Sequence, residues 1–105
     1  MKKVIMLQEG QFGTKHWFSS NIDADKFYAE NFLKGGKELI EKVFEMKDNE
    51  SMFAVHIGEP MSCPTDFNAM YVATSSEAQA EAKGREYIRA WSLTNERVLK
   101  VRKVA

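Results

Sequence analysis

The chain has 105 residues and a mass of 12.0 kDa, the size of one ordinary domain. Apolar residues make up 44% of it and charged residues 29%, fractions typical of a globular protein and not of a disordered one. The 15 basic side chains balance the 15 acidic ones, which argues against a protein that coats DNA by charge alone and against an acidic DNA mimic. We therefore expect one globular domain that spans residues 1–105.

The sequence predicts neither export nor membrane insertion. The apolar run at residues 4–7 is shorter than the roughly 7–15 residues of a secretory signal core. No apolar run approaches the roughly 18–20 residues that cross a bilayer, so we expect no membrane partner. Cys63 is the single cysteine, which makes an internal disulfide impossible and favours a reducing, cytoplasmic setting.

The first elements predict a hairpin. Residues 2–8 are expected to form a short strand with both faces partly covered, because four apolar side chains follow one another in it. Gly10 and Gly13 indicate a turn after this strand. Residues 14–19 are then expected to return beside it as a second strand.

A long amphipathic pattern follows the hairpin. Residues 20–23 include several N-cap candidates, and apolar residues at helical spacing run from about residue 24 to residue 47. Two adjacent glycines in a helix interior cost about 2 kcal/mol relative to alanine. We therefore expect a bend or a break at Gly35-Gly36, with two helices joined at the pair.

The second half of the chain predicts strands at residues 51–57, 67–74 and 97–104. The loop at 58–66 separates the first two of these strands and holds both prolines. We also expect a helix between the second and the third strand.

A capping box marks the start of that helix. Thr74 is the expected N-cap and Glu77 occupies the third helical position, so the helix should run to about Trp91. Ala80 and Gly84 stack one turn apart, which indicates a helix pressed closely onto a sheet. The expected buried stripe of this helix consists of Ala80, Gly84, Tyr87, Ile88 and Trp91.

Without the strand at 14–19, the order of elements is β-α-β-β-α-β, as in the ferredoxin-like fold. We therefore expect an α+β fold of two layers, an antiparallel sheet with both helices on one face. It is either ferredoxin-like or a variant with an extra N-terminal hairpin strand. The other face of the sheet is then open to solvent, a ligand or a partner. Many unrelated functions use this fold, so the function has to be argued from the residues.

The two histidines and Cys63 are the candidates for metal binding or covalent catalysis. A zinc site built on His56 and Cys63 would need acidic ligands such as Glu59 and Asp66, and the spacing matches no metal motif. A nucleophilic Cys63 would need a base, which His56 or His16 could supply. The glycines match neither phosphate-binding pattern. We expect no metal and no cofactor, and keep a small enzyme using Cys63 as an alternative.

Aromatic residues are the stronger candidates for binding. Trp17 and Phe18 follow the glycine turn and are a plausible protein-contact anchor, although strand alternation would bury one of the two. Phe67 and Tyr71 lie on one side of their strand. On an open face they could stack bases, as an RNA-recognition motif does, and otherwise they belong to the core.

These observations favour a small intracellular protein-interaction module without catalytic activity. Such a module would act as a regulator or inhibitor, for example as an accessory protein of a phage or mobile element. The expected partner is another protein, with a homodimer through an edge strand or the open sheet face as one form. Single-stranded nucleic-acid binding through aromatics and a small-ligand sensing domain are the alternatives. The expected contact residues are Trp17, Phe18, Phe67 and Tyr71.

Overall fold

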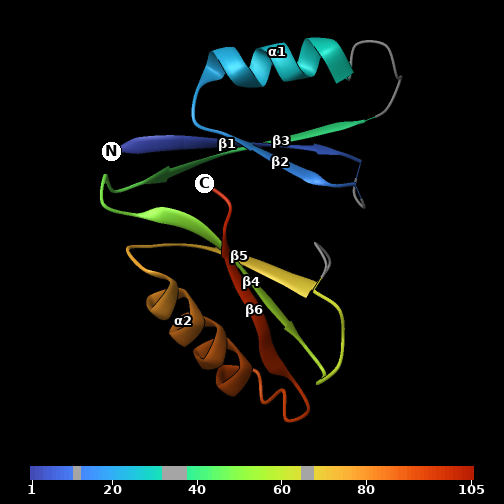
Figure 1. Ribbon diagram of the computed structural model, residues 1–105, viewed down its shortest axis with the longest axis vertical. Coiled ribbons are helices and arrows are strands. Elements are labelled where there is room, and N and C mark those ends of the chain that lie inside the picture. Colours follow the sequence, from blue (N-terminus) through green and yellow to red (C-terminus); the bar gives the residue numbers. More distant parts are fainter. Residues whose placement is uncertain (11–12, 32–37, 65–67) are drawn as a thin grey trace. The chain divides into compact units, whose positions relative to one another are not determined.

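The computed structural model describes residues 1–10, 13–31, 38–64 and 68–105. Within these residues the chain is α+β, with two helices and two antiparallel sheets of three strands each (Figure 1). The chain divides into two compact units. Unit 1 comprises residues 1–48 with Ala105, and unit 2 comprises residues 49–104.

Unit 1 is a three-stranded sheet covered on one face by a helix. Its elements are β1 (Lys2–Glu9), β2 (Lys15–Phe18), α1 (Asn21–Asn31) and β3 (Leu39–Met46). The central strand β1 pairs antiparallel with both neighbours, in the order β2-β1-β3. Helix α1 begins after Ser20, whose Oγ accepts a 3.2 Å hydrogen bond from the backbone N–H of Asp23. The core beneath α1 is formed by Ile5, Leu7 and Ala24, against which Phe18, Phe27 and Leu39 pack.

The prediction of a helical pattern up to residue 47 is wrong in its second half. Helix α1 ends at Asn31, and residues 39–46 form β3, which pairs with β1 along its whole length. The apolar residues of this segment fit a helical stripe, and Ile40, Phe44 and Met46 share one face of the strand. Eight residues of β3 pair with the buried strand β1, and this tertiary gain outweighs local helix propensity. The predicted break at Gly35-Gly36 lies outside the described residues.

Unit 2 has a second sheet and a second helix. Its elements are β4 (Ser51–Gly58), β5 (Ala69–Thr74), α2 (Glu77–Ala90) and β6 (Arg97–Lys103). The strand order is β5-β4-β6, and both pairs are antiparallel. Helix α2 packs on one face of this sheet. The core there consists of Phe53, Val55, Ile57 and Ala80, with Met70, Val72, Ile88, Val98 and Val101 packed against it.

The start of α2 differs from the predicted capping box. The N-cap is Ser76, whose Oγ accepts a 3.2 Å hydrogen bond from the backbone N–H of Gln79. Thr74 still belongs to β5, where it is buried and paired with Ser51. Its hydroxyl donates to the Ser76 carbonyl at 2.8 Å. The strand therefore continues through the predicted cap, and the helix begins two residues later.

The close approach of α2 to the sheet is confirmed. Gly84 is buried, and a Cβ atom at this position would lie 2.6 Å from Cγ1 of Val55 and 3.1 Å from Cγ2 of Val98. Ala80 is fully buried one turn earlier. Small residues at both positions let the helix backbone lie close to β4 and β6.

The α+β class and the N-terminal hairpin strand are confirmed, the latter by the pairing of β2 with β1. A single domain and a ferredoxin-like arrangement stay predictions. Within the described ranges, no helix combines the length and the apolarity needed to cross a membrane.

Candidate functional site

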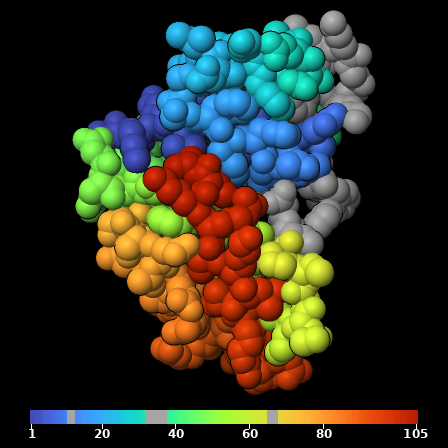
Figure 2. Space-filling view, viewed as in Figure 1, coloured from blue at the N-terminus to red at the C-terminus, as the bar shows by residue number. Residues whose placement is uncertain are grey.

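One end of unit 2 brings together its loops and the last turns of α2. Gly58 at the end of β4 pairs with Arg97 at the start of β6, and β5 begins nearby at Ala69, opposite His56. Helix α2 runs back to this end from the far end of β5. In the space-filling view, β6 (red) lies at the surface between α2 (orange) and the loop after β4 (yellow-green) (Figure 2). We call this region, residues 59–64 and 85–97, the loop end of unit 2.

Two aromatic side chains of α2 are exposed at the loop end. The side chains of Tyr87 and Trp91 are 41% and 68% exposed, and their ring centroids lie 6.1 Å apart. The prediction that both belong to the buried stripe is wrong. The buried line of α2 runs through Ala80 and Gly84 toward Ile88, and Tyr87 lies about 100° from Ile88 around the helix axis. Trp91 is the C-cap residue, so it lies beyond the last full turn.

The backbone that carries Trp91 is fixed by a Schellman motif. The N–H of Ser92 donates to the carbonyl of Arg89 at 3.2 Å, and the N–H of Leu93 donates to the carbonyl of Ile88 at 3.0 Å. Ser92 adopts the left-handed conformation, with φ of +54°. Glycine is the usual residue there, and a serine costs about 1 kcal/mol. The chain thus holds Trp91 in one backbone geometry at an energetic cost.

A second strained residue lies in the loop after β4. Met61 has φ of +78°, and its side chain is 98% exposed. It follows Pro60 in a turn closed by a 3.1 Å hydrogen bond from the N–H of Ser62 to the carbonyl of Glu59. Among the described residues, Met61 and Ser92 are the two non-glycine residues with positive φ, and both lie at the loop end. Strained residues cluster at functional sites, so this coincidence directs attention to the loop end.

Two hollows flank the last turns of α2. The apolar hollow, on the β5 side, has a volume of about 470 Å³ and includes Ile57, Met70, Tyr87 and Leu93 in its wall. The arginine hollow, on the β6 side, has a volume of about 380 Å³ and is lined by Arg85, Ile88, Arg89, Glu96, Arg97 and Val98. Glu96 contributes to both.

Positive charge is concentrated around the arginine hollow. All four arginines of the chain lie between positions 85 and 102, and residues 83–103 carry seven basic and two acidic side chains. Arg85 forms a 2.7 Å ion pair with Glu81, one turn earlier on α2. Nη1 of Arg97 donates to the carbonyls of Thr94 and Glu96, at 3.2 Å and 2.7 Å. These backbone contacts orient the Arg97 guanidinium without neutralising it.

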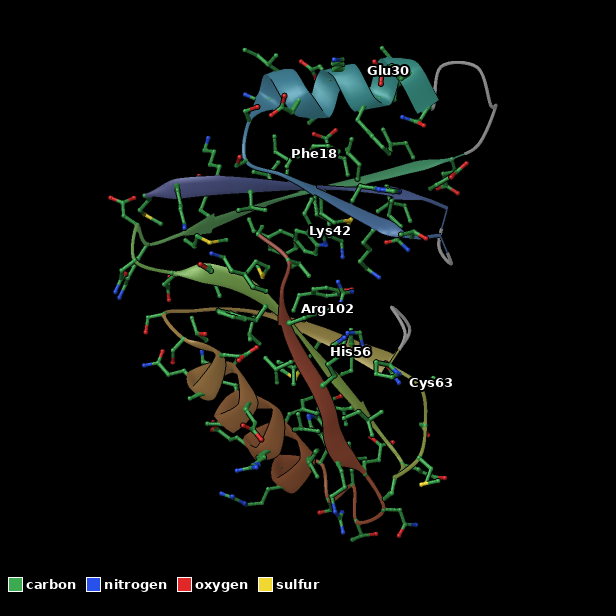
Figure 3. The ribbon with its side chains drawn as sticks, viewed as in Figure 1. Phe18, Glu30, Lys42, His56, Cys63 and Arg102 are labelled. Atoms are coloured by element: carbon green, nitrogen blue, oxygen red, sulfur yellow. The ribbon has the colours of Figure 1, made fainter. Side chains whose placement is uncertain are left out.

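A chain of side-chain hydrogen bonds connects the loop after β4 to the sheet. Nε–H of Arg102 donates to Nε2 of His56 at 3.1 Å, so the ring proton of the neutral imidazole belongs on Nδ1. Nδ1 lies 3.1 Å from Oδ1 of Asn68, whose Nδ2 donates to the backbone carbonyl of Cys63 at 3.1 Å. In Figure 3, the His56 ring on β4 and the Arg102 side chain on β6 point toward one another, and Cys63 lies in the loop. The bonds tie this loop to β4 and β6.

This hydrogen-bond chain does not assemble a cysteine nucleophile. His56 is buried and connects to Cys63 through Asn68 and a backbone carbonyl, whereas the cysteine itself is exposed and free. For the metal site weighed from the sequence, Asp66 lies outside the described residues. Within the part that the structure describes, no group of three or more histidine, cysteine or acidic side chains could hold a metal ion. The hydrogen bonds of His56 connect it to Arg102 of β6 and, through Asn68, to the loop after β4.

The aromatic residues expected from the sequence lie elsewhere. Phe18 and Trp17 point to opposite faces of β2. The ring centroids of Phe18 and Phe27 of α1 lie 5.2 Å apart, and those of Trp17 and Phe44 of β3 lie 5.7 Å apart. Both side chains are half-buried in unit 1. Tyr71 is half-buried on β5 in unit 2, paired with Ala54, and Phe67 lies outside the described residues. The structure places the exposed aromatic pair on α2 instead.

Comparison of the chain with known protein families, with curated proteins and with solved structures finds no significant match in any of the three. The residues of the loop end are therefore interpreted by their geometry alone. The sequence did hold one signal for them, because Tyr87 and Trp91 are four residues apart, a spacing at which side chains are neighbours on a helix.

Proposed function

We propose that this chain is a non-catalytic protein-interaction module that binds its partner through the loop end of unit 2. The observation that carries the proposal is the exposed Tyr87–Trp91 pair beside the apolar hollow. Tryptophan, tyrosine and arginine are the residue types enriched at binding hot spots, and all three meet here. A regulator or inhibitor is the kind of module we propose, in a reducing compartment that suits the exposed free Cys63.

The geometry favours binding because the anchor residue is already positioned. The Schellman motif fixes the backbone of Trp91, so association orders little more than its side chain. The neighbouring apolar hollow offers room for one side chain of the partner against Tyr87. Truncation of a central hot-spot residue typically costs about 2 kcal/mol or more in binding free energy.

Single-stranded nucleic acid is the second candidate, since an aromatic pair beside arginines can stack bases. Acidic side chains oppose this alternative. Glu81, Glu86 and Glu96 alternate with the arginines along α2 and the following loop, and they would repel a phosphate backbone. A homodimer through the same surface is a further form of the module.

The test compares three purified full-length proteins as baits in a lysate of the source organism. These are the wild type, Trp91→Ala, and a matched control, Ile22→Ala, which removes a side chain that is 79% exposed on α1. We expect a stoichiometric protein that the wild type and Ile22→Ala retain after nuclease treatment, and that Trp91→Ala retains at least tenfold less. Equal retention by Trp91→Ala, loss on nuclease treatment, or no retained protein would each overturn the proposal. Light scattering of the free wild type detects a homodimer.

A further inference from the structure

We propose that the arginine hollow binds carboxylate side chains of an acidic segment of the partner protein. This inference rests on the proposed function and specifies the chemistry of the partner. Three arginines line the hollow from two elements, Arg85 and Arg89 on α2 and Arg97 on β6. Ile88 and Val98 add apolar surface, and Glu96 is the one acidic residue of the lining, so the basic residues outnumber it three to one. Arginine binds carboxylates through paired hydrogen bonds, and apolar surroundings strengthen such bonds.

The three positive charges are unevenly neutralised. Arg85 and Arg89 lie one turn apart on α2, a spacing at which like charges repel. Arg85 is paired with Glu81, and Arg97 donates to backbone carbonyls. Among the residues that the structure describes, no carboxylate forms an ion pair with Arg89. An incoming carboxylate would therefore meet Arg89 and Arg97, neither of which forms an ion pair with an acidic side chain of the described residues, and Glu96 is the one acidic residue beside them in the hollow.

The positions of the two hollows indicate which side chains the acidic segment would carry. They lie on either side of the last turns of α2 and share Glu96. A short peptide can place an acidic side chain against Arg89 and Arg97 and an apolar side chain against Tyr87. A nucleic acid carries a phosphate on every nucleotide, so more of its charges than those of a short peptide would lie near Glu96. The mixed charge favours a protein segment over a polyanion.

The probe is an acetylated, amidated hexapeptide of sequence EELEEL, with its uncharged counterpart QQLQQL as control. Titration of the isotope-labelled full chain is followed by NMR through the backbone and arginine Nε–H signals. We expect EELEEL to shift the signals of Arg85, Arg89 and Arg97 in a saturable way and QQLQQL to shift them at least tenfold less. Inorganic phosphate and a twelve-residue oligothymidylate are titrated in parallel. Signal shifts of equal size with phosphate would show that the hollow binds anions in general and not an acidic segment in particular. Tighter binding of the oligothymidylate would favour a nucleic acid as the ligand.

Matched variants separate a specific hollow from diffuse charge. Arg89→Gln removes one charge inside the hollow, whereas Lys83→Gln removes one charge from an exposed position of the same helix outside it. Arg89→Gln should weaken EELEEL binding at least fivefold and Lys83→Gln less than twofold. Equal losses would overturn the inference.

The lysate experiment then distinguishes the two proposals. If Trp91→Ala no longer retains the partner and Arg89→Gln still does, the result contradicts the carboxylate site and supports the interaction surface. If both variants keep the partner, both proposals fall. Loss of the partner with both Trp91→Ala and Arg89→Gln, together with its retention by Lys83→Gln, supports both proposals.

Discussion

The backbone N–H of Leu93 donates a 3.0 Å hydrogen bond to the carbonyl of Ile88 and thereby closes the turn that follows α2. The turn requires the left-handed conformation at Ser92, with φ of +54°. Because serine is strained there, Ser92→Gly should raise the free energy of unfolding by about 0.5–1 kcal/mol. Ser92→Ala, which keeps the Cβ atom, is the control and should give no gain. Urea unfolding of both variants checks this, and a glycine variant no more stable than the alanine variant would contradict the strain.

Gly84 gives a second prediction about α2. Alanine would favour the helix by about 1 kcal/mol, but its Cβ would lie 2.6 Å from Cγ1 of Val55. Overpacking of this kind costs about 1–3 kcal/mol, so Gly84→Ala should be net destabilising. Combining it with Val55→Ala removes the contact, and the double variant should lose less stability than the two single losses added together. Thermal unfolding of the three variants measures this coupling, and strict additivity would refute the close contact.

The hydrogen bonds of Asn68 lead to a prediction about the local stability of the loop after β4. Its amide connects His56 to the carbonyl of Cys63, and removing one such hydrogen bond costs about 1 kcal/mol. Asn68→Ala should therefore speed amide hydrogen exchange in residues 59–64. Asn49→Ala, at an exposed turn position, is the control. Nitrogen chemical shifts of the His56 ring should also show the proton on Nδ1, and a proton on Nε2 would contradict the bond from Arg102.

The expectation of one domain also leads to a measurement. Each unit has about half of the 105 residues, and a chain of that length is marginally stable by itself. Leu7→Ala in unit 1 and Val55→Ala in unit 2 each remove a buried core side chain. Both should lower the midpoint of one common unfolding transition, monitored by circular dichroism and by tryptophan fluorescence. Two separate transitions, each sensitive to one variant, would show two domains.

Strand prediction succeeded for β1, β4 and β6, of which β1 and β4 are mostly buried and β6 is half-buried or exposed. The segments around β1, β4 and β6 have apolar patterns that a helix of similar length would not suit, and their bounds match within a residue or two. Residues 39–46 were predicted as helix because Leu39, Val43 and Ile40 also fit a helical stripe. Their pairing with β1 is a long-range property that a local pattern does not contain.

The candidate site was harder to predict for a related reason. Tyr87 and Trp91 are apolar residues on an amphipathic helix, and the sequence places such residues in the core by default. Their exposure of 41% and 68% depends on how α2 packs on the sheet, which a local sequence pattern does not contain. Trp17 and Phe18 were chosen for residue type, and their contacts with Phe44 and Phe27 emerge only once the strands are paired.

The exposure of Trp91 leads to a prediction about the stability of Trp91→Ala, the variant used in the binding experiment. A side chain that is 68% exposed contributes little to the core, so Trp91→Ala should change the free energy of unfolding by less than about 1 kcal/mol. Phe53→Ala, at a position that is 6% exposed, should cost about 3–5 kcal/mol. Denaturant unfolding of both variants gives the comparison. A loss with Trp91→Ala close to that of Phe53→Ala would mean that Trp91 holds the fold together. A small loss means that reduced partner retention by Trp91→Ala reports on the binding surface itself.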